Sequence, residues 1–325
     1  MNSTPTPLLL SQLNPEHNLQ DALTRLEREV RSAPNSASHR WALAELLCLL
    51  GHWERALKQL QVGSKLADAK DVKDIKDNKE SAQWQAKAQL LRGLVRAEAQ
   101  RTQVFAGQLL PVPVVDRPVW MEELARAIAA NEKGDHAQAD RLRRSALDVA
   151  PTRAGVCAWV DDTLPNPPSD IPPDTVATQA LAEQAFDWIS DTDTRLGPVC
   201  EFIVAGGYRW LAYADIATLE LARPSSLLDL VWLPATLRLR STEAGARPLR
   251  GFIPARYSGT ENIAAEIGSS QRDALMLSRL TRWQDVGETG VFALGQKTLM
   301  TPDRDIPLLA IRSLRTDADA KDALP

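Results

Sequence analysis

The densest group of side chains that could do chemistry lies between Phe186 and Glu201. Four carboxylates share this stretch: Asp187, Asp191, Asp193 and Glu201. Two carboxylates held close together can act as general acid and general base, because burial can raise the pKa of one while the other stays ionised. The stretch therefore predicts, as one alternative, a carboxylate-based hydrolase or a metal-binding domain.

A calcium site of the EF-hand type does not fit this stretch. Counted from Asp191, the twelfth position is Phe202, where a bidentate Glu is required. The sixth position is Leu196 rather than Gly. The carboxylates lack the spacing of this ion-binding loop.

The favoured interpretation of the same carboxylates is structural. We expect Asp193 and Arg195 to cap and brace the turn into Gly197 and Pro198. The sequence contains no P-loop, no dinucleotide-binding glycine motif, no HExxH and no GxSxG elbow. No catalytic residue, no cofactor and no metal is predicted.

Histidine and cysteine are too sparse for the usual sites built from them. The four histidines are His17, His39, His52 and His136, so the second half alone cannot hold a His-dependent triad or a histidine-ligated zinc. The three cysteines are Cys48, Cys157 and Cys200, which form no CxxC pair and no disulfide framework. A reducing compartment is expected.

Composition restricts the class of protein further. The chain has 325 residues, is 44% hydrophobic and 25% charged, and carries a formal net charge of −4, which excludes a disordered chain. Residues 176–315 hold 15 basic and 16 acidic side chains, which argues against nucleic-acid binding. The richest apolar run, Trp41 to Leu50, is interrupted by Glu45 and is too short to cross a bilayer. We expect a soluble cytoplasmic protein without membrane insertion.

The first 160 residues are predicted to be helical, because apolar residues recur there at helical spacing. Asn14-Pro15-Glu16 is a helix-start signal before the first apolar stripe. Two predicted helix pairs share a spacing typical of tetratricopeptide (TPR) hairpins. Its residues are Ala44, Gly51, Trp53 and Ala56 in one pair, and Ala127, Gly134 and Ala139 in the other. The charged segment Asp68 to Glu80 lies between them and is interpreted as a solvated loop or helix extension.

Five prolines in the fourteen residues from Asp161 to Asp174 mark a predicted boundary. The predicted division is a TPR-like all-α domain over 1–160, a Pro-rich linker over 161–175, a mixed α+β domain with mostly antiparallel strands over 176–316, and a tail over 317–325. In the second domain we expect helices over 176–188 and 270–280. The expected strands are 199–205 and 208–213, joined at Gly206-Gly207, then 232–239, 249–253, 291–300 and 306–313.

Several blocks of the second domain resemble one known family. They are Phe186-Asp187-Trp188-Ile189, Asp193-x-Arg195-Leu196-Gly197-Pro198, Glu201, Gly207-Tyr208-x-Trp210, Leu230-Val231-Trp232-x-Pro234-Ala235, Ile253-Pro254-Ala255-Arg256-Tyr257, Ser278-Arg279-x-Thr281-x-Trp283 and Gly295-Gln296. Taken in order, they resemble the ImpE family, also called TagJ or SciE-type, of bacterial type VI secretion virulence clusters. Two positions depart from the pattern: Ser258, where proline is common, and Lys297, where arginine is usual.

The resemblance implies an accessory protein and no established catalytic residue. It implies as partners the small subunit of the cytoplasmic contractile sheath, through an amphipathic amino-terminal helix, and the AAA+ unfoldase that recycles sheaths. The matched residues are therefore candidates for structure and interface. Two binding surfaces stay open: a groove of the helical hairpins, and a sheet edge or patch around Arg256, Tyr257 and Trp283. A TPR module for peptide carboxyl termini is disfavoured, because the hairpins show no matching array of cations.

Overall fold

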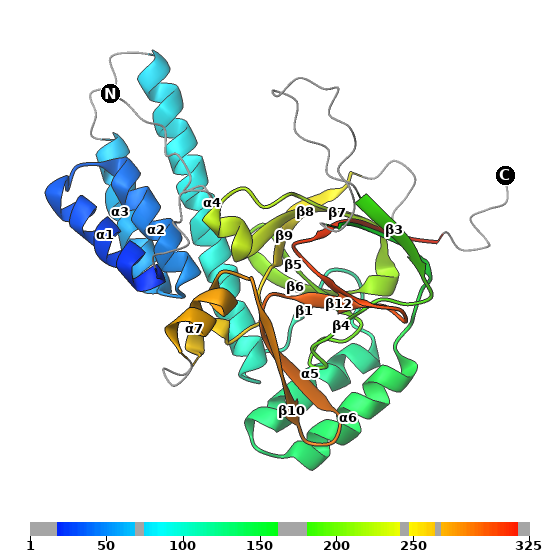
Figure 1. The fold of residues 1–325 in the computed structure, drawn as a ribbon. Helices are drawn as coiled ribbons and strands as arrows, with labels where there is room; N and C mark the ends of the chain where they lie inside the picture. The colour runs from blue at the N-terminus through cyan, green and yellow to red at the C-terminus, as the bar shows by residue number, and fades with distance from the viewer. Residues whose placement is uncertain (1–17, 69–74, 162–180, 241–246, 264–267, 318–325) are drawn as a thin grey trace.

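The computed structural model describes residues 18–68, 75–161, 181–240, 247–263 and 268–317 (Figure 1). Its first part is helical and its second part is built on a large sheet, as the sequence predicts. The helices of the first part are α1 (Leu19–Ser32), α2 (Ala37–Leu49), α3 (Trp53–Asp68), α4 (Ile75–Phe105), α5 (Val119–Glu132) and α6 (His136–Val149). One more α-helix, α7 (Ser269–Met276), matches the helix predicted over 270–280, but it starts one residue earlier and ends four residues earlier.

The two predicted hairpins are α2–α3 and α5–α6, and each turns at a glycine. Gly51 has φ +75° and Gly134 has φ +77°, a left-handed backbone that glycine adopts without a steric penalty. The helix α1 is capped by Asn18, whose Oδ1 accepts the amide of Asp21 at 2.8 Å. The predicted start signal at residues 14–16 lies outside the described residues. Of the charged segment over 68–80, residues 75–80 form the start of α4 and residues 69–74 lie outside the described part.

Among the described residues, nine strands form one sheet, in the order β1-β6-β5-β9-β8-β7-β14-β2-β3. The strands are β1 (Val112–Pro113), β2 (Gly155–Val160), β3 (Leu181–Phe186), β5 (Val199–Val204), β6 (Gly207–Ala212), β7 (Ile216–Leu221), β8 (Trp232–Leu239), β9 (Leu249–Pro254) and β14 (Ile311–Thr316). All neighbouring pairs are antiparallel except β1 with β6. The predicted class, helical hairpins followed by a mostly antiparallel α+β part, is confirmed.

Three shorter strands and one hairpin complete the second part. Strands β4 (Ser190–Asp191), β12 (Thr298–Met300) and β13 (Asp305–Pro307) pair as a small sheet, and β10 (Thr281–Val286) pairs with β11 (Gly290–Gly295). The 3-10 helices in this part are η2 (Tyr213–Asp215), η3 (Leu227–Leu230) and η4 (Thr260–Asn262). The β5–β6 hairpin turns at Ala205 and Gly206, with φ of +50° and +68°. The sequence predicts this hairpin, with its turn placed at Gly206-Gly207.

Several predicted elements are wrong. The helix expected over 176–188 is the strand β3 where the structure describes it, because β3 pairs along its whole length with β2. Residues 155–160 and 112–113, expected in a wholly helical region, are strands of the large sheet. The single strand expected over 291–300 is broken at Gly295, whose φ is +89°. The strand expected over 306–313 is likewise two strands, β13 and β14.

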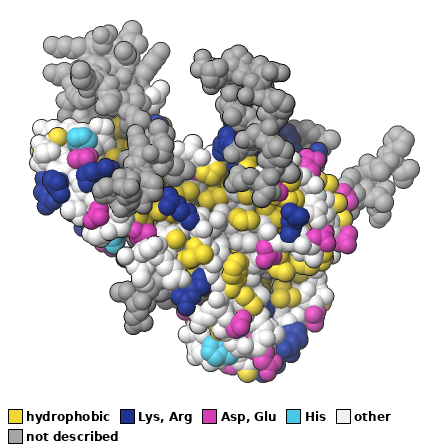
Figure 2. Space-filling model, in the orientation of Figure 1, with side chains coloured by type: hydrophobic (Ala, Val, Ile, Leu, Met, Phe, Trp, Pro, Cys, Tyr) yellow, Lys and Arg dark blue, Asp and Glu magenta, His cyan; other side chains and the backbone are white. Residues whose placement is uncertain are grey.

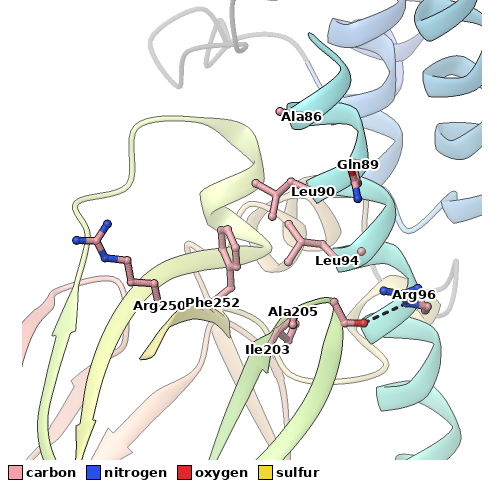
Figure 3. A pocket seen from close by; sticks show the side chains of 12 residues that line it. Ala86, Gln89, Leu90, Leu94, Arg96, Ile203, Ala205, Arg250 and Phe252 are labelled. Carbon is pink, nitrogen blue, oxygen red and sulfur yellow. Dashed lines mark hydrogen bonds between the residues drawn. The ribbon is translucent and has the colours of Figure 1, made fainter. Parts of the chain in front are cut away.

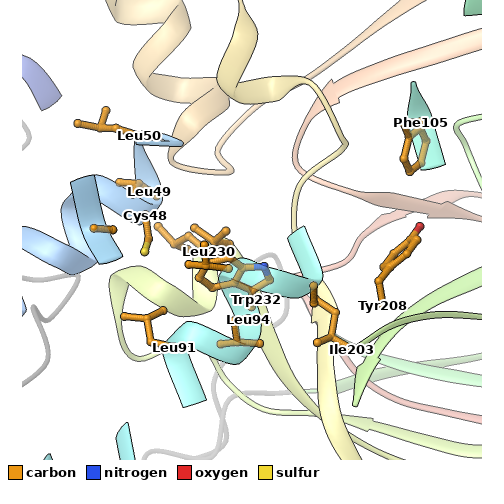
Figure 4. Packing of buried hydrophobic residues seen from close by; sticks show 14 of the residues in the cluster. Cys48, Leu49, Leu50, Leu91, Leu94, Phe105, Ile203, Tyr208, Leu230 and Trp232 are labelled. Atoms are coloured by element: carbon orange, nitrogen blue, oxygen red, sulfur yellow. The ribbon is translucent and has the colours of Figure 1, made fainter. Parts of the chain in front are cut away.

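One hydrophobic core joins the helices to the sheet. Trp232 on β8 lies between Leu94 of α4 and the end of α2 near Leu49 (Figure 4). Its ring also packs against Trp53 of α3, with the ring centroids 5.6 Å apart. Because both parts contribute to the same buried cluster, the helical part is packed firmly onto the sheet. A second cluster, which includes Cys157, fills the space between the large sheet and the β12–β13 hairpin.

Candidate functional site

A cluster of buried charges lies where the second half of α4 crosses the sheet. It contains four cations and four anions: Arg101, Arg195, Arg256 and Lys297, with Glu98, Asp191, Asp193 and Glu201. We call this set the junction cluster. Seven of its members are buried, and Arg195 is half-buried. Charges can be buried at tolerable cost only when they are paired and hydrogen-bonded, and the opposite signs here balance.

Arg101 connects α4 to the sheet through a forked ion pair. Its Nε lies 2.7 Å from Oε1 of Glu201 on β5, and its Nη2 lies 3.1 Å from Oε2. Nη1 contacts Glu98 one turn earlier at 3.0 Å, and Nη2 also donates to the carbonyl oxygen of Arg256 at 2.8 Å. Bidentate arginine–carboxylate pairs are both strong and directional, so they fix the angle at which α4 crosses the sheet.

Aromatic side chains complete the hydrogen bonds of both glutamates. The hydroxyl of Tyr208 donates to Oε1 of Glu201 at 2.5 Å, and Nε1 of Trp210 donates to that hydroxyl at 2.6 Å. Nε1 of Trp232 donates to Oε2 of Glu98 at 3.1 Å. Each glutamate is therefore satisfied by side chains from more than one element.

Lys297 lies between two carboxylates in the same cluster. Its Nζ is 2.5 Å from Oδ2 of Asp191 and 2.8 Å from Oε2 of Glu201. Asp191 in turn accepts the hydroxyl of Tyr257 at 2.8 Å. Lys297 directly follows Gly295-Gln296 and supplies the positive charge between the two carboxylates.

The pKa values follow from these pairs. Burial alone would raise the pKa of Glu201, but Arg101 and Lys297 outweigh it and lower that pKa to about 2. Burial would lower the pKa of Lys297, yet Asp191 and Glu201 keep it above its usual value. Lys297 and Glu201 therefore form a pair of charged groups, whereas burial outweighs the contact with Lys297 at Asp191 and raises the pKa of that carboxyl.

Asp193 and Arg195 brace the turn before β5, as the sequence predicts. Oδ1 of Asp193 accepts the amide of Arg195 at 2.9 Å, and its Oδ2 accepts Nη2 of Arg195 at 2.5 Å. The guanidinium also lies 5.0 Å from the ring centroid of Phe105 and 4.6 Å from that of Phe292. The amide of Gly197 closes the turn on the carbonyl oxygen of Asp193.

Arg256 connects the ends of two helices, α2 and α7, to the junction cluster. Its Nη1 donates to the carbonyl oxygens of Leu49 at the end of α2 and of Met276 at the end of α7, both at 2.8 Å. These are carbonyls that a helix leaves without internal partners, and a cation suits the negative end of the helix dipole. Arg256 therefore holds α2 and α7 against β9.

A second charged contact joins α6 to the β10–β11 hairpin. Asp140 accepts the amides of Glu288 and Thr289 at 2.9 and 3.1 Å, and the hydroxyl of Thr289 at 2.7 Å. Arg143 donates to the same carboxylate at 3.0 Å. The hydrogen bond from the Glu288 amide is the largest of the effects that lower the pKa of Asp140, to about 2. Together these contacts hold the hairpin turn on α6.

Known proteins resemble both parts of the chain. The family model described as ImpE protein matches residues 183–315. A curated relative, "Type VI secretion system accessory component TagJ" of Pseudomonas aeruginosa, is 33% identical over 296 residues, which cover 91% of this chain and 86% of the relative. The chain belongs to the ImpE family.

A solved structure shares the fold. It is the crystal structure of protein VPA1032 from Vibrio parahaemolyticus, with a TM-score of 0.69 and 24% sequence identity. The match covers 93% of this chain and 95% of that one. The arrangement of helical hairpins on a sheet therefore extends beyond this sequence.

The structure brings most of the predicted ImpE signature residues into or beside the junction cluster. The buried ones are Asp193, Gly197, Glu201, Tyr208, Trp210, Trp232, Arg256 and Tyr257, and the half-buried ones are Trp188, Arg195, Pro198 and Gln296. Asp187 and Arg279 are exposed and lie outside it, and Trp283 is 45% exposed while its Nε1 donates to Thr192 at 3.0 Å. The burial of Arg256 and Tyr257 removes them from any surface that a partner could touch.

The sequence interpretation missed the residues that the helices contribute. Glu98 and Arg101 of α4, and Asp140 and Arg143 of α6, were not singled out. All four are buried polar residues in helices. A charged residue at a position that the helical period assigns to the buried face is the signal that could have revealed them.

The positions of the four predicted carboxylates can be compared with what a hydrolase or a metal site requires. Asp191, Asp193 and Glu201 converge, but each is paired with a cation, and Asp187 is exposed and apart from them. Over the described ranges, no group of three or more His, Cys, Asp or Glu side chains is arranged to hold a metal ion. Cys48, Cys157 and Cys200 are all buried free thiols, and burial raises the pKa of Cys157 and of Cys200 to about 12. The cluster is arranged to join two parts of the protein.

No helix in the part of the chain that the structure describes combines the length and apolar character that crossing a bilayer requires.

Proposed function

We propose that this protein is a non-enzymatic accessory component of a bacterial type VI secretion system. The observation that carries the proposal is the similarity over 91% of the chain to TagJ, a protein named as such a component. The geometry of the junction cluster agrees with it, because the carboxylates that could act in catalysis are already paired with cations.

We further propose that the partner is the small subunit of the contractile sheath, bound through that subunit's amphipathic amino-terminal helix. The AAA+ unfoldase that recycles sheaths is the second proposed partner, with this protein as the link between them. The proposal implies a cytoplasmic location, because the sheath it would bind lies in the cytoplasm. These partners come from the resemblance of the signature blocks.

Co-purification tests this function directly. Tagged full-length protein is mixed with the purified small sheath subunit, and in parallel with a version that lacks the amino-terminal helix. We expect retention of the complete subunit and loss of retention without the helix. Failure to retain the complete subunit, or equal retention of both versions, would contradict the proposed partner.

A second arm tests the link to the unfoldase. The AAA+ protein is added to the preformed complex, and size-exclusion chromatography follows whether all three proteins elute together. We expect a ternary complex that depends on this protein. A binary complex of sheath subunit and unfoldase that excludes this protein would contradict the linking role.

A further inference from the structure

An open groove runs between the first half of α4 and the β5–β9 side of the sheet (Figure 3). Its volume is about 430 Å³. Leu90 and Leu94 of α4 face Phe252 of β9 across it, with Ile203 of β5 at its base. Leu90 is 50% exposed, so the groove offers apolar surface to the solvent.

The fold leaves this space open for a local reason. Strands β5 and β9 are paired at only one position, Ile203 with Phe252. The β5–β6 turn bends towards α4, and a Cβ built on Gly206 would lie 3.0 Å from Cα of Gly93. Two glycines therefore let the turn touch the helix, and this contact closes one end of the groove.

The walls of the groove carry positive charge only. Of the twelve residues that line the groove, two are basic and none is acidic. Arg96 and Arg250 line the groove itself, and both are exposed. Arg96 donates to the carbonyl oxygen of Gly206 at 3.2 Å, and no carboxylate among the described residues pairs with either arginine. An apolar floor flanked by cations is complementary to an apolar surface flanked by acids.

The occupant that fits this surface is a helix of another protein. The lining positions of α4 run from Ala86 to Arg96, which corresponds to about 15 Å of helix, or about three turns of a helix laid alongside it. A small-molecule site has convergent, buried polar groups, whereas the polar groups here are two exposed arginines at the rim. Figure 2, which views the molecule in the orientation of Figure 1, shows Lys, Arg, Asp and Glu side chains spread over that face of the protein.

We propose that this groove binds an amphipathic α-helix of a partner protein, with apolar anchors at positions i, i+3, i+4 and i+7 and acidic residues beside them. Leu90, Leu94 and Phe252 contact the apolar face, and Arg96 and Arg250 pair with the acidic flanks. The inference rests on the proposed function, which names an amphipathic helix of the small sheath subunit as the bound element. It assigns the site of binding and the chemistry of the helix.

The test measures binding of the purified small sheath subunit to the full chain and to two groove variants. Leu90→Glu places an acid on the apolar wall, and the double variant Arg96→Glu with Arg250→Glu reverses both charges. All three positions are exposed, so the variants are expected to fold as the parent does. The matched controls are Val149→Glu and Arg141→Glu on α6, which are also exposed.

We expect each groove variant to weaken binding by about tenfold or more, and the controls to bind within about twofold of the parent. Raising the salt concentration should weaken binding to the parent and have less effect on the charge-reversed variant. Unchanged binding by both groove variants would overturn the assigned site while the proposed function stands.

A second probe separates the site from the identity of the partner. It is a pair of designed 18-residue amphipathic helices with leucines at the same spacing, flanked by glutamates in one and by lysines in the other. We expect the full chain to bind the acidic helix about tenfold more tightly, and the charge-reversed variant to prefer the basic one. If the sheath subunit does not bind but this preference is found, the proposed partner fails and the groove stands. If neither helix binds, or both bind equally, the groove proposal is overturned.

Discussion

The two halves of α4 contact the same sheet in opposite ways. Around Glu98 and Arg101 the helix contributes buried charges that are all paired with side chains or carbonyls of the sheet. Around Leu90 and Arg96 the helix leaves apolar and basic groups exposed beside an open groove. The comparison shows that burial decides the role of a charge: paired charges inside hold the two parts together, while unpaired ones at the surface are available to a partner.

The largest expected effect is on the buried half of α4. Glu201→Gln removes one partner of Arg101 and Lys297 and leaves two cations buried without a full counter-charge. We expect a loss of about 3–5 kcal/mol in the free energy of unfolding, measured by urea denaturation. The matched control is Glu122→Gln, whose partner Arg126 is exposed, and its effect should be at most about 1 kcal/mol. Similar losses in the two variants would show that the junction cluster is not what joins the parts.

The pH dependence of stability gives the next largest effect. The pKa of Glu201 is about 2 in the folded protein and has an ordinary value of 4.5, so its contribution is complete above pH 4.5 and is lost as the pH falls towards 2. The size of this contribution is on the order of 3 kcal/mol, from 1.36 kcal/mol per unit of pKa and a fall of about 2.5 units. Between pH 7 and pH 2.5, the free energy of unfolding should fall less steeply in Glu201→Gln than in the parent, because the variant lacks this acid-dependent contribution. An identical slope in parent and variant would contradict the low pKa of Glu201.

Asp140→Asn tests the second charged contact. The amide keeps the shape of the side chain but loses the charge that accepts the two backbone amides and pairs with Arg143. We expect a loss of about 1–3 kcal/mol, with faster hydrogen exchange in β10 and β11 than in the large sheet. Uniformly faster exchange throughout the protein would instead show that this contact supports the whole fold.

Gly206→Ala tests the contact that closes the groove. Gly206 and Gly134 both have positive φ, but a Cβ at Gly206 would meet Arg96 and Gly93, whereas one at Gly134 would meet nothing within 4 Å. Each alanine should cost about 1–2 kcal/mol for the left-handed backbone, and Gly206→Ala should cost more than Gly134→Ala. Equal losses in thermal unfolding would mean that α4 and the turn do not touch closely.

The smallest expected effect is at the exposed wall of the groove. Leu90→Gln should change the free energy of unfolding by no more than about 0.5 kcal/mol, because the side chain is half exposed. Leu94→Ala, one turn further along and buried, should lose about 2–5 kcal/mol. The two variants separate a position kept for contact with a partner from one kept for the core. A large loss in Leu90→Gln would place that residue in the core instead.

The predicted division into domains at residues 161–175 stays a prediction. The strand β2 precedes this stretch yet pairs with β3 and β14 in the large sheet. Limited proteolysis within 162–180 tests the division. We expect the two fragments to remain associated under native conditions, because the sheet and the shared core span the cut.

Local patterns made much of the fold predictable. The hairpin turns at Gly51, Gly134 and Gly206, and the strand over 232–239, depend on neighbours in the sequence. The bracing of the turn by Asp193 and Arg195 is also local, because the two residues are two positions apart in the sequence. Beta-strand β3 was missed because its short apolar pattern fits a helix until a partner strand is known.

The sequence by itself determined which side chains had to find partners: an arginine-rich second half with nearly equal numbers of acids, and carboxylates gathered between residues 187 and 201. Only the tertiary structure decided which side chains pair, because the partners are far apart in the sequence. Arg101 lies 100 residues from Glu201, and Lys297 lies 106 residues from Asp191. Hydrophobic periodicity and the residue preferences of turns act over a few residues. Which residues form ion pairs across a core depends instead on which elements pack together. For the same reason, the groove exists only because α4 lies across the β5–β9 side of the sheet.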